Sequence, residues 1–317
     1  MGETGLRLII AFAVLLVAFG LSGGLTWIER RVLALWQDRY GPNRAGPFGA
    51  LQIVADLLKL FTKEDWVPPF AEKTTFVLAP AIVVVAMMMA LVFIPFSPVI
   101  FVARLDVALL FLLGMLALSV YSVVLAGWSS NNKYSLIGGL RSVAQMLSYE
   151  VFMGLSLMGV IMLAESFDMV DIVNAQRRIW FFIPQILGFS VFMIGGIAVI
   201  HRLPLDLPEA ESELVAGYHT EYSGLKFGLL FMGEYLGIIL ISALTVVLFF
   251  GGWLGPGLPP VLWFIIKFSF FVGLFILLRA TLPRLRFDQL VVFSWKVLLP
   301  LSFFNIVATG GIILAMQ

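Results

Sequence analysis

Residues 227–250 read FGLLFMGEYLGIILISALTVVLFF, a run of 24 residues in which Glu234 is the only carboxylate and no Lys or Arg occurs. A helix needs about twenty predominantly apolar residues to cross a hydrocarbon core of roughly 30 Å. The segment meets this length, so we expect it to be a membrane-spanning helix.

Seven further segments satisfy the same criterion within a few residues, approximately 7–28, 76–96, 106–128, 142–164, 181–200, 261–282 and 290–314. The composition agrees, because 61% of the chain is hydrophobic and 12% is charged, against about 45–50% and 25% in soluble domains. We therefore predict an all-α fold. It is a polytopic membrane helical bundle of about eight transmembrane helices plus one amphipathic helix, forming a single membrane domain over residues 1–317.

The basic residues are distributed unequally between the two sides of this bundle. Fourteen Lys and Arg fall on the side that holds 29–75 and 201–226, whereas four (Arg7, Arg104, Arg177 and Arg178) fall on the other. By the positive-inside rule, the side with fourteen is cytoplasmic and both termini face outward. The net charge of +1 and the lack of a basic patch give no indication of nucleic-acid binding.

The connection 201–226, HRLPLDLPEAESELVAGYHTEYSGLK, concentrates carboxylates between two apolar segments: Asp206, Glu209, Glu211, Glu213 and Glu221. On composition alone this is an ordinary acidic surface. The alternative is a set of proton-binding groups placed next to the membrane. His201 and His219 are not joined to further ligands by any metal-binding spacing, so we expect no metal site.

Ionisable residues inside the expected spans are few. Glu150 lies near mid-membrane, and Glu234 is flanked by Gly233 and Gly237 at a spacing that allows close helix approach. Each alone could be an ion pair or a protonated carboxyl. Together with the acidic connection, they form a row of titratable groups that reaches into the membrane and predicts a proton pathway.

Four cations lie in or near the ends of the spans. Lys267 and Lys296 fall inside spans and could supply opposite charges to the buried carboxylates. For Arg104 and Arg279, near span ends, snorkelling of the side chain to the interface is a sufficient explanation.

The cytoplasmic segment contains an amphipathic helix between residues 50 and 63. Gln52, Asp56, Lys59 and Lys63 are spaced by four, three and four residues and share one face, and apolar residues cover the remainder. One interpretation is a helix that anchors the bundle at the interface. The other is that its apolar side and the adjacent Arg-rich segment enclose a chamber for a long hydrophobic ligand.

Several long blocks closely resemble one family. They are ERR at 29–31, QDRYGPNRAGPFGALQIVADLLKLFTKEDW at 37–66, AGWSSNNKYSLIGGLRSVAQMLSYEV at 126–151, PLDLPEAESELVAGYHTEYSGLKFG at 204–228 and FGGW at 250–253. The chain resembles the family of NADH-quinone oxidoreductase H subunits almost from end to end. Leu205 departs from the family's pattern, which has Phe at this place.

The resemblance implies a membrane subunit of a proton-translocating NADH:quinone oxidoreductase in a bacterial inner membrane. It places Glu29, Arg30, Arg31, Arg39 and Asp56 along a chamber for a quinone, either ubiquinone or menaquinone. It makes Glu209, Glu211, Glu213 and Glu221, with Asp206, an acidic funnel that Glu150 and Glu234 continue into the membrane.

The resemblance also implies the partners. They are peripheral-arm subunits that carry FMN and iron-sulfur clusters, small membrane subunits and antiporter-like subunits, so the isolated chain is not expected to be catalytic. The sequence has no Cys and so lacks the usual ligands of an iron-sulfur cluster.

Two alternatives remain at this stage. One is the equivalent subunit of an energy-converting hydrogenase or of a complex with another electron donor. The other is a stand-alone ion transporter, for which we would expect repeat symmetry and interrupted helices, and neither is clear in the sequence.

Overall fold

The computed structural model describes residues 3–209 and 211–316. Within these residues the structure is helical and contains no strand. Seven helices are long and apolar enough to cross a membrane. They are α1 (Glu3–Trp36), α3 (Lys73–Val92), α4 (Ala108–Ser129), α5 (Lys133–Ala164), α9 (Gly224–Phe249), α10 (Pro260–Thr281) and the continuous span Phe287–Met316.

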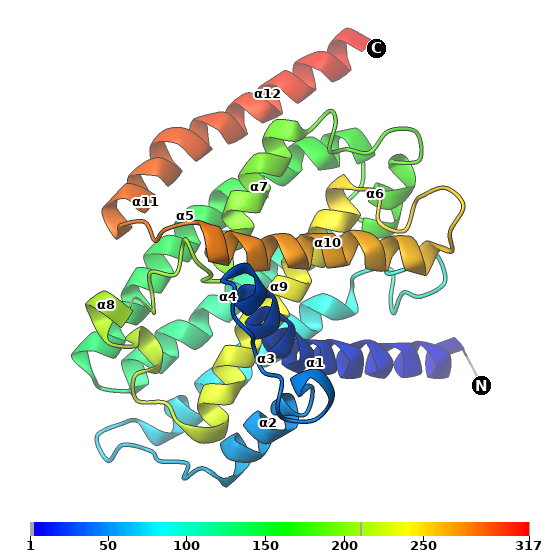
Figure 1. The fold of residues 1–317 in the computed structure, drawn as a ribbon. Coiled ribbons are helices and arrows are strands. Elements are labelled where there is room, and N and C mark those ends of the chain that lie inside the picture. The colour runs from blue at the N-terminus through cyan, green and yellow to red at the C-terminus, as the bar shows by residue number, and fades with distance from the viewer. Residues whose placement is uncertain (1–2, 210, 317) are drawn as a thin grey trace.

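The last span has three parts: α11 (Phe287–Phe293), a π-helical turn (Ser294–Leu298) and α12 (Leu299–Met316). The shorter helices are α2 (Gln52–Thr62), α6 (Met169–Ala175), α7 (Ile186–Val199) and α8 (Glu211–Leu214). Single 3-10 turns cover Pro47–Gly49 and Gly217–His219. The beginning of α1 and the end of α12 lie toward one end of the bundle, and α8 lies toward the opposite end (Figure 1).

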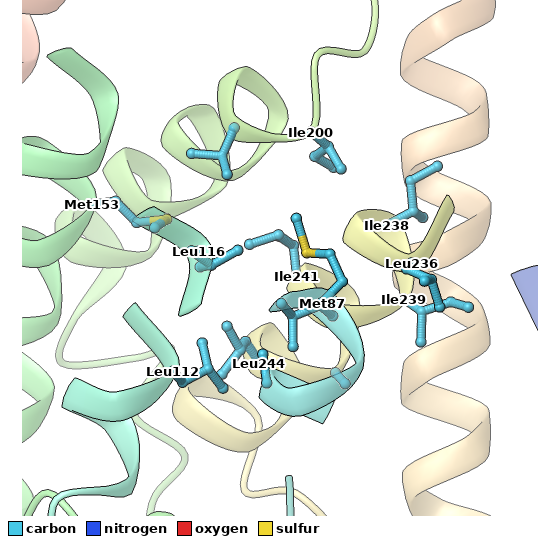
Figure 2. Close-up of a cluster of buried hydrophobic side chains, with 14 of the residues drawn as sticks. Met87, Leu112, Leu116, Met153, Ile200, Leu236, Ile238, Ile239, Ile241 and Leu244 are labelled. Carbon is cyan, nitrogen blue, oxygen red and sulfur yellow. The ribbon is translucent and has the colours of Figure 1, made fainter. Parts of the chain in front are cut away.

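Helix α9 forms the centre of the bundle, because every residue from Gly233 to Phe249 is buried. Figure 2 shows its side chains surrounded by residues of α3, α4, α5 and the end of α7, among them Met87, Leu112, Met153 and Ile200. A helix that is apolar all round is buried all round. The apolar segment 227–250 is therefore the core around which the other helices pack.

Glycines on α9 permit this packing, as their spacing predicts. A Cβ atom on Gly233 would lie 2.7 Å from Cγ2 of Val83 on α3, and one on Gly237 would meet Ile200. Since such distances are far below ordinary van der Waals contact, the glycines allow α9 to approach its neighbours closely.

A proline inside α3 links this helix to the acidic connection. Pro80 has no N–H, so the carbonyl of Phe76 loses its helical donor. The hydroxyl of Tyr222 donates to that carbonyl at 3.1 Å, and its ring stacks on Phe76 with centroids 4.0 Å apart. The connection thus supplies the hydrogen bond that the helix lacks.

The expected span 181–200 is shorter than predicted, because α7 has only 14 residues and begins at Ile186. Pro184 disfavours helical geometry in the preceding residue. The backbone at 181–182 bonds elsewhere: the N–H of Phe181 donates to Oε1 of Gln176 and that of Phe182 to the carbonyl of Phe249. The chain therefore approaches α7 through turns that are held by side chains and by α9.

Lys267 does not supply charge to a buried carboxylate. Its ammonium donates to the carbonyls of Phe250, Gly252 and Leu254 at 2.6, 3.1 and 2.7 Å and lies 4.4 Å from the ring centroid of Trp180. It occupies the end of α9 that is far from the acidic connection, where it satisfies backbone groups that water cannot reach.

Two helices extend beyond their expected limits. Helix α1 continues to Trp36, so Glu29, Arg30 and Arg31 are helical and not part of a loop, and α5 begins at Lys133, nine residues before position 142. The expected limits were set by the length of the apolar segments, whereas a helix can continue beyond the hydrocarbon core into the polar region. The three charged residues of α1 consequently point in different directions around its axis.

The close contact at Gly233 leads to a prediction about stability. We expect Gly233→Ala to lower the free energy of unfolding by about 1–3 kcal/mol, because Val83 must shift. On α4, a Cβ on Gly114 would meet no atom within 4 Å, so Gly114→Ala should be neutral or slightly stabilising. Thermal unfolding of the two purified variants measures the difference, and equal unfolding temperatures would contradict the packing described for α9.

Candidate functional site

A cavity of about 160 Å³ lies between α1, α2 and α9. Its lining is largely apolar, with Ile53 and Leu60 from α2 and Phe231 and Met232 from α9. Polar groups are few: Ser22, Thr26 and Arg30 from α1, Asp56 and Lys59 from α2, and the hydroxyl-bearing ring of Tyr235 from α9. An apolar cavity with a few placed polar groups is the usual form of a site for an organic ligand.

Arg30 and Asp56, both predicted chamber residues, meet at this cavity. Nη1 of Arg30 lies 2.6 Å from Oδ2 of Asp56, whose other oxygen accepts from Nε2 of Gln52 at 3.0 Å. The guanidinium of Arg30 therefore joins α1 to α2 across one wall of the cavity.

Helix α2 is amphipathic and lies where its spacing predicts, but its apolar residues divide between two directions. Ile53 and Leu60 line the cavity, whereas Leu58 and Phe61 are 59% and 66% exposed. Each of the two interpretations of this helix therefore describes part of its surface: one side encloses the cavity, and the other is apolar and uncovered by this chain.

The other three predicted chamber residues lie outside the cavity lining. Glu29 is buried on another side of α1, where it bonds Arg279. Arg31 donates to the carbonyl of Phe48 and lies over its ring, and the exposed Arg39 donates to Gln37 at 2.9 Å.

Arg202 is the centre of a second group of residues, which we call the Arg202 cluster: Glu29, Arg202, Asp206, Glu209, Glu234, Arg279 and Arg284. The Arg202 side chain is 7% exposed. Its Nη1 is 3.5 Å from Glu29 Oε1, and its Nη2 is 3.4 Å from Glu234 Oε2. The guanidinium thus lies between carboxylates of α1 and α9.

The cluster is held in place from α5. Nε2 of Gln145 donates to the carbonyls of Ala198 and Leu205 at 2.8 and 2.7 Å, and Ser142 Oγ is 2.6 Å from Nε2 of His201. These bonds fix the turn that carries Arg202 and Asp206. Leu205, the departure from the family pattern, is buried beside them.

Two carboxyl groups of the cluster have raised pKa values. Burial and the charge of Glu209 raise the pKa of Asp206 to about 7, although Arg284, 2.8 Å away, opposes the shift. Burial and the charge of Glu234 raise the pKa of Glu209 well above its usual range. Burial lowers the pKa of His219, 3.5 Å from Glu209, to about 4, so its ring is neutral at pH 7.

A small cavity of about 20 Å³ adjoins Glu234. His201, Tyr218, Ser119 and Ser122 contribute to its lining. The volume is sufficient for one water molecule, so the carboxyl of Glu234 has a polar space next to it.

Three other predicted proton-pathway residues, Glu213, Glu221 and Glu150, make no hydrogen bond or ion pair with the cluster among the described residues. Glu213 pairs with Arg141 at 2.5 Å, and Glu221 accepts from Nδ2 of Asn132, the N-cap of α5, at 2.6 Å. On α5, Oε1 of Glu150 is buried and has no hydrogen-bond partner among the described residues. The side chain of Glu211 lies outside the described part of the chain.

The cations of the cluster were not among the residues predicted for the site. Arg279 does not merely snorkel, because it bonds Glu29, and Arg104 bonds Asp168 at 2.5 Å and also Asp171. Arg202 and Arg284 were counted only for topology. The sequence did contain a usable signal, since Arg202 and Arg284 each follow an expected span on the same side of the bundle as the acidic connection.

The comparisons with known proteins agree with this architecture. A sequence model of the family described as NADH dehydrogenase matches residues 7–310. The H subunit of the NADH-quinone oxidoreductase of Methylococcus capsulatus (strain Bath) is 55% identical to the chain over 304 residues, which cover 96% of each protein. Identity of this extent over nearly the whole length shows a shared fold and family, and the chain therefore belongs to the family of NADH-quinone oxidoreductase H subunits.

Proposed function

We propose that this chain is the H subunit of a proton-translocating NADH:quinone oxidoreductase and that it serves as a single membrane domain. In this proposal the cavity between α1, α2 and α9 receives part of a quinone, and the Arg202 cluster transmits the change of charge on quinone reduction toward the membrane. The family and the polar groups at the apolar cavity support the proposal.

The observation that carries the proposal is a layer of aromatic rings that lies between the cavity and the Arg202 cluster. Phe231 and Tyr235 line the cavity. Cζ of Arg202 lies 4.4 Å from the ring centroid of Tyr235 and 5.8 Å from that of Phe231. A charge that appears in the cavity would therefore act on Arg202 through a single layer of low dielectric constant, where electrostatic interactions are strong.

The cavity suits a section of a long apolar ligand. Sites that enclose a drug-sized molecule measure about 300–1,000 Å³, so the cavity would hold some isoprenoid units and leave the remainder to partner subunits. Arg30, Asp56 and Lys59 provide donors and an acceptor for a polar headgroup in transit. These contacts would accept the headgroup of either ubiquinone or menaquinone.

The reduction of a quinone to a quinol takes up electrons and protons together. Electrons would arrive through FMN and iron-sulfur clusters of peripheral-arm subunits, consistent with a chain that has no Cys. The pKa of Asp206 is raised to about 7 and that of Glu209 well above its usual range, so both carboxyls hold a proton more readily than an exposed carboxyl does. A shift in the position of Arg202 would then favour one protonation state of the pair.

The proposed setting is a bacterial inner membrane, with both termini on the periplasmic side and the acidic connection on the cytoplasmic side. The distribution of Lys and Arg supports this orientation. Glu150 and Glu234 would continue the pathway from Asp206 and Glu209 toward the small membrane subunits and antiporter-like subunits.

The pathway is tested by removing one proton site at a time in the assembled complex. We expect Glu234→Gln and Glu150→Gln to reduce proton pumping per electron by at least about tenfold, since an amide cannot exchange a proton. Glu165→Gln, at the exposed end of α5, is the matched control. Proton release and NADH oxidation are measured together, and normal pumping in both test variants would refute the pathway.

The cavity is tested separately with Asp56→Asn, which removes the charge opposite Arg30. We expect the KM for a short-chain quinone to rise by about tenfold, because a charge-assisted hydrogen bond is lost. Electron transfer from NADH to a soluble acceptor at the peripheral arm should not change. Arg39→Gln, outside the cavity, is the control, and an unchanged KM in Asp56→Asn would contradict the assignment.

The pKa of Asp206 predicts a pH dependence with a definite sign. Quinone reductase activity should show a step near pH 7. Arg284 lowers the pKa of Asp206, so Arg284→Gln should move this step to higher pH. Arg286→Gln, whose exposed partner is Asp288, should leave it in place. A step that moves to lower pH, or that is equal in both variants, would exclude Asp206 as its origin.

A further inference from the structure

The last span packs on the bundle through one narrow stripe. The buried residues of the stripe follow each other at intervals of three or four: Leu290, Ser294, Leu298, Ser302, Asn305 and Thr309. Nδ2 of Asn305 donates to Oε1 of Gln185 at 2.8 Å, and Nε2 of Gln185 donates to Oγ1 of Thr309, also at 2.8 Å. These bonds fix the rotation of the span about its own axis.

Lys296 lies on the opposite side of the span. It is in the π-helical turn, two residues from Ser294 and two from Leu298, and both of these are buried. Since two residues correspond to about half a turn of helix, the Lys296 side chain points away from the bundle, and it is exposed. Among the described residues no ion pair or hydrogen bond joins Lys296 to another side chain.

The neighbours of Lys296 on this side are apolar. Val292, Phe303 and Val307 are 50%, 52% and 72% exposed, at spacings of four, seven and eleven residues from Lys296. We call these four residues the Lys296 face. Lys296 is the only charged residue of the span after Asp288. The Lys296 face is therefore an apolar strip with a single cation near its centre.

Lys296 is also far from the end of the span. The exposed pair Arg286 and Asp288 marks the polar end, and Lys296 follows Asp288 by eight residues, or about 12 Å along the axis. A phosphate at the headgroup level therefore lies well above the Lys296 backbone. An unpaired ammonium facing hydrocarbon at this depth is costly, and membrane proteins usually pair such groups.

We propose that the Lys296 face is the docking surface for a membrane helix of another subunit and that a carboxylate on that helix pairs with Lys296. The positive charge of Lys296 identifies the partner as a helix that carries a carboxylate. A purely apolar helix would bury the ammonium without a partner. A second copy of this chain, related by a two-fold axis, would bring Lys296 against its own counterpart.

Substitutions at Lys296 in the assembled complex test the proposal. With a paired carboxylate, Lys296→Met leaves that carboxylate unpaired, and the fraction of the chain that stays with its membrane partners after detergent extraction should fall by about tenfold. Lys296→Glu should lower it further, and Lys296→Arg should keep it. Lys133→Met, at the exposed start of α5, is the control.

The opposite result is expected if the side chain only snorkels to the headgroups. Lys296→Met would then be neutral or favourable, because a charge is removed from the hydrocarbon, and retention equal to that of the native chain would overturn the proposal. The level of each variant in whole membranes separates failed folding from failed docking.

A chemical measurement on the native complex supplies an independent result. Dicyclohexylcarbodiimide activates carboxyl groups in apolar surroundings, and attack by the Lys296 amine would form an amide and release the urea. We expect a cross-linked peptide that joins Lys296 to a carboxylate in a membrane segment of another chain. An intact complex in which Lys296 forms no such link would count against the proposal.

Discussion

The buried guanidinium of Arg202 is the constraint on which the site depends. A cation removed from water is tolerable only with carboxylates and polarisable rings around it, and removal of one partner from such a group typically costs about 3–5 kcal/mol. Glu29, Glu234 and the ring of Tyr235 satisfy this requirement. They come from α1 and α9, so a single charge fixes the relative positions of the helix that lines the cavity and the helix at the centre of the bundle.

The connection after α7 is consequently a packed element and not a loose loop. Gln145 holds one of its carbonyls, that of Leu205, together with the carbonyl of Ala198 in the last turn of α7, and a Cβ atom on Gly138 would lie 2.8 Å from the backbone nitrogen of Tyr218. Because its neighbours are fixed, the proton affinities of Asp206 and Glu209 depend on burial and on particular charges rather than on bulk solvent. The same residues in a mobile loop would behave as ordinary surface acids.

The sequence predicted the helices better than it predicted the site. Apolar length identified the spans, and polar spacing identified α2, because both depend on local periodicity. It did not predict the late start of α7 at Ile186, because Gln176 and α9 take the backbone hydrogen bonds of the preceding residues, nor did it predict the continuation of α1 through Glu29.

Among the site residues, Arg30 and Asp56 were assigned to one chamber by the family resemblance alone, and their side chains meet in the structure. The partners of Glu29 and Glu234 were not predicted, because ion pairs between helices far apart in sequence depend on tertiary packing. Glu213 and Glu221 have partners on α5 or at its N-cap that composition could not reveal. A cluster of acids in a sequence is therefore not yet a cluster in space.

The half of α9 that is distant from the acidic connection is a layer of low dielectric constant. From Leu236 to Phe249 its residues are all buried, and Ser242 and Thr245 are the only polar ones. These 14 residues cover about 21 Å. The turn backbone beyond them is closed by the ammonium of Lys267. Moving one charge across a membrane at 100 mV involves about 2.3 kcal/mol, in addition to the cost of entering such a layer. This half of α9 therefore forms a layer that a charge can cross only at high cost, directly beside the chain's own titratable cluster.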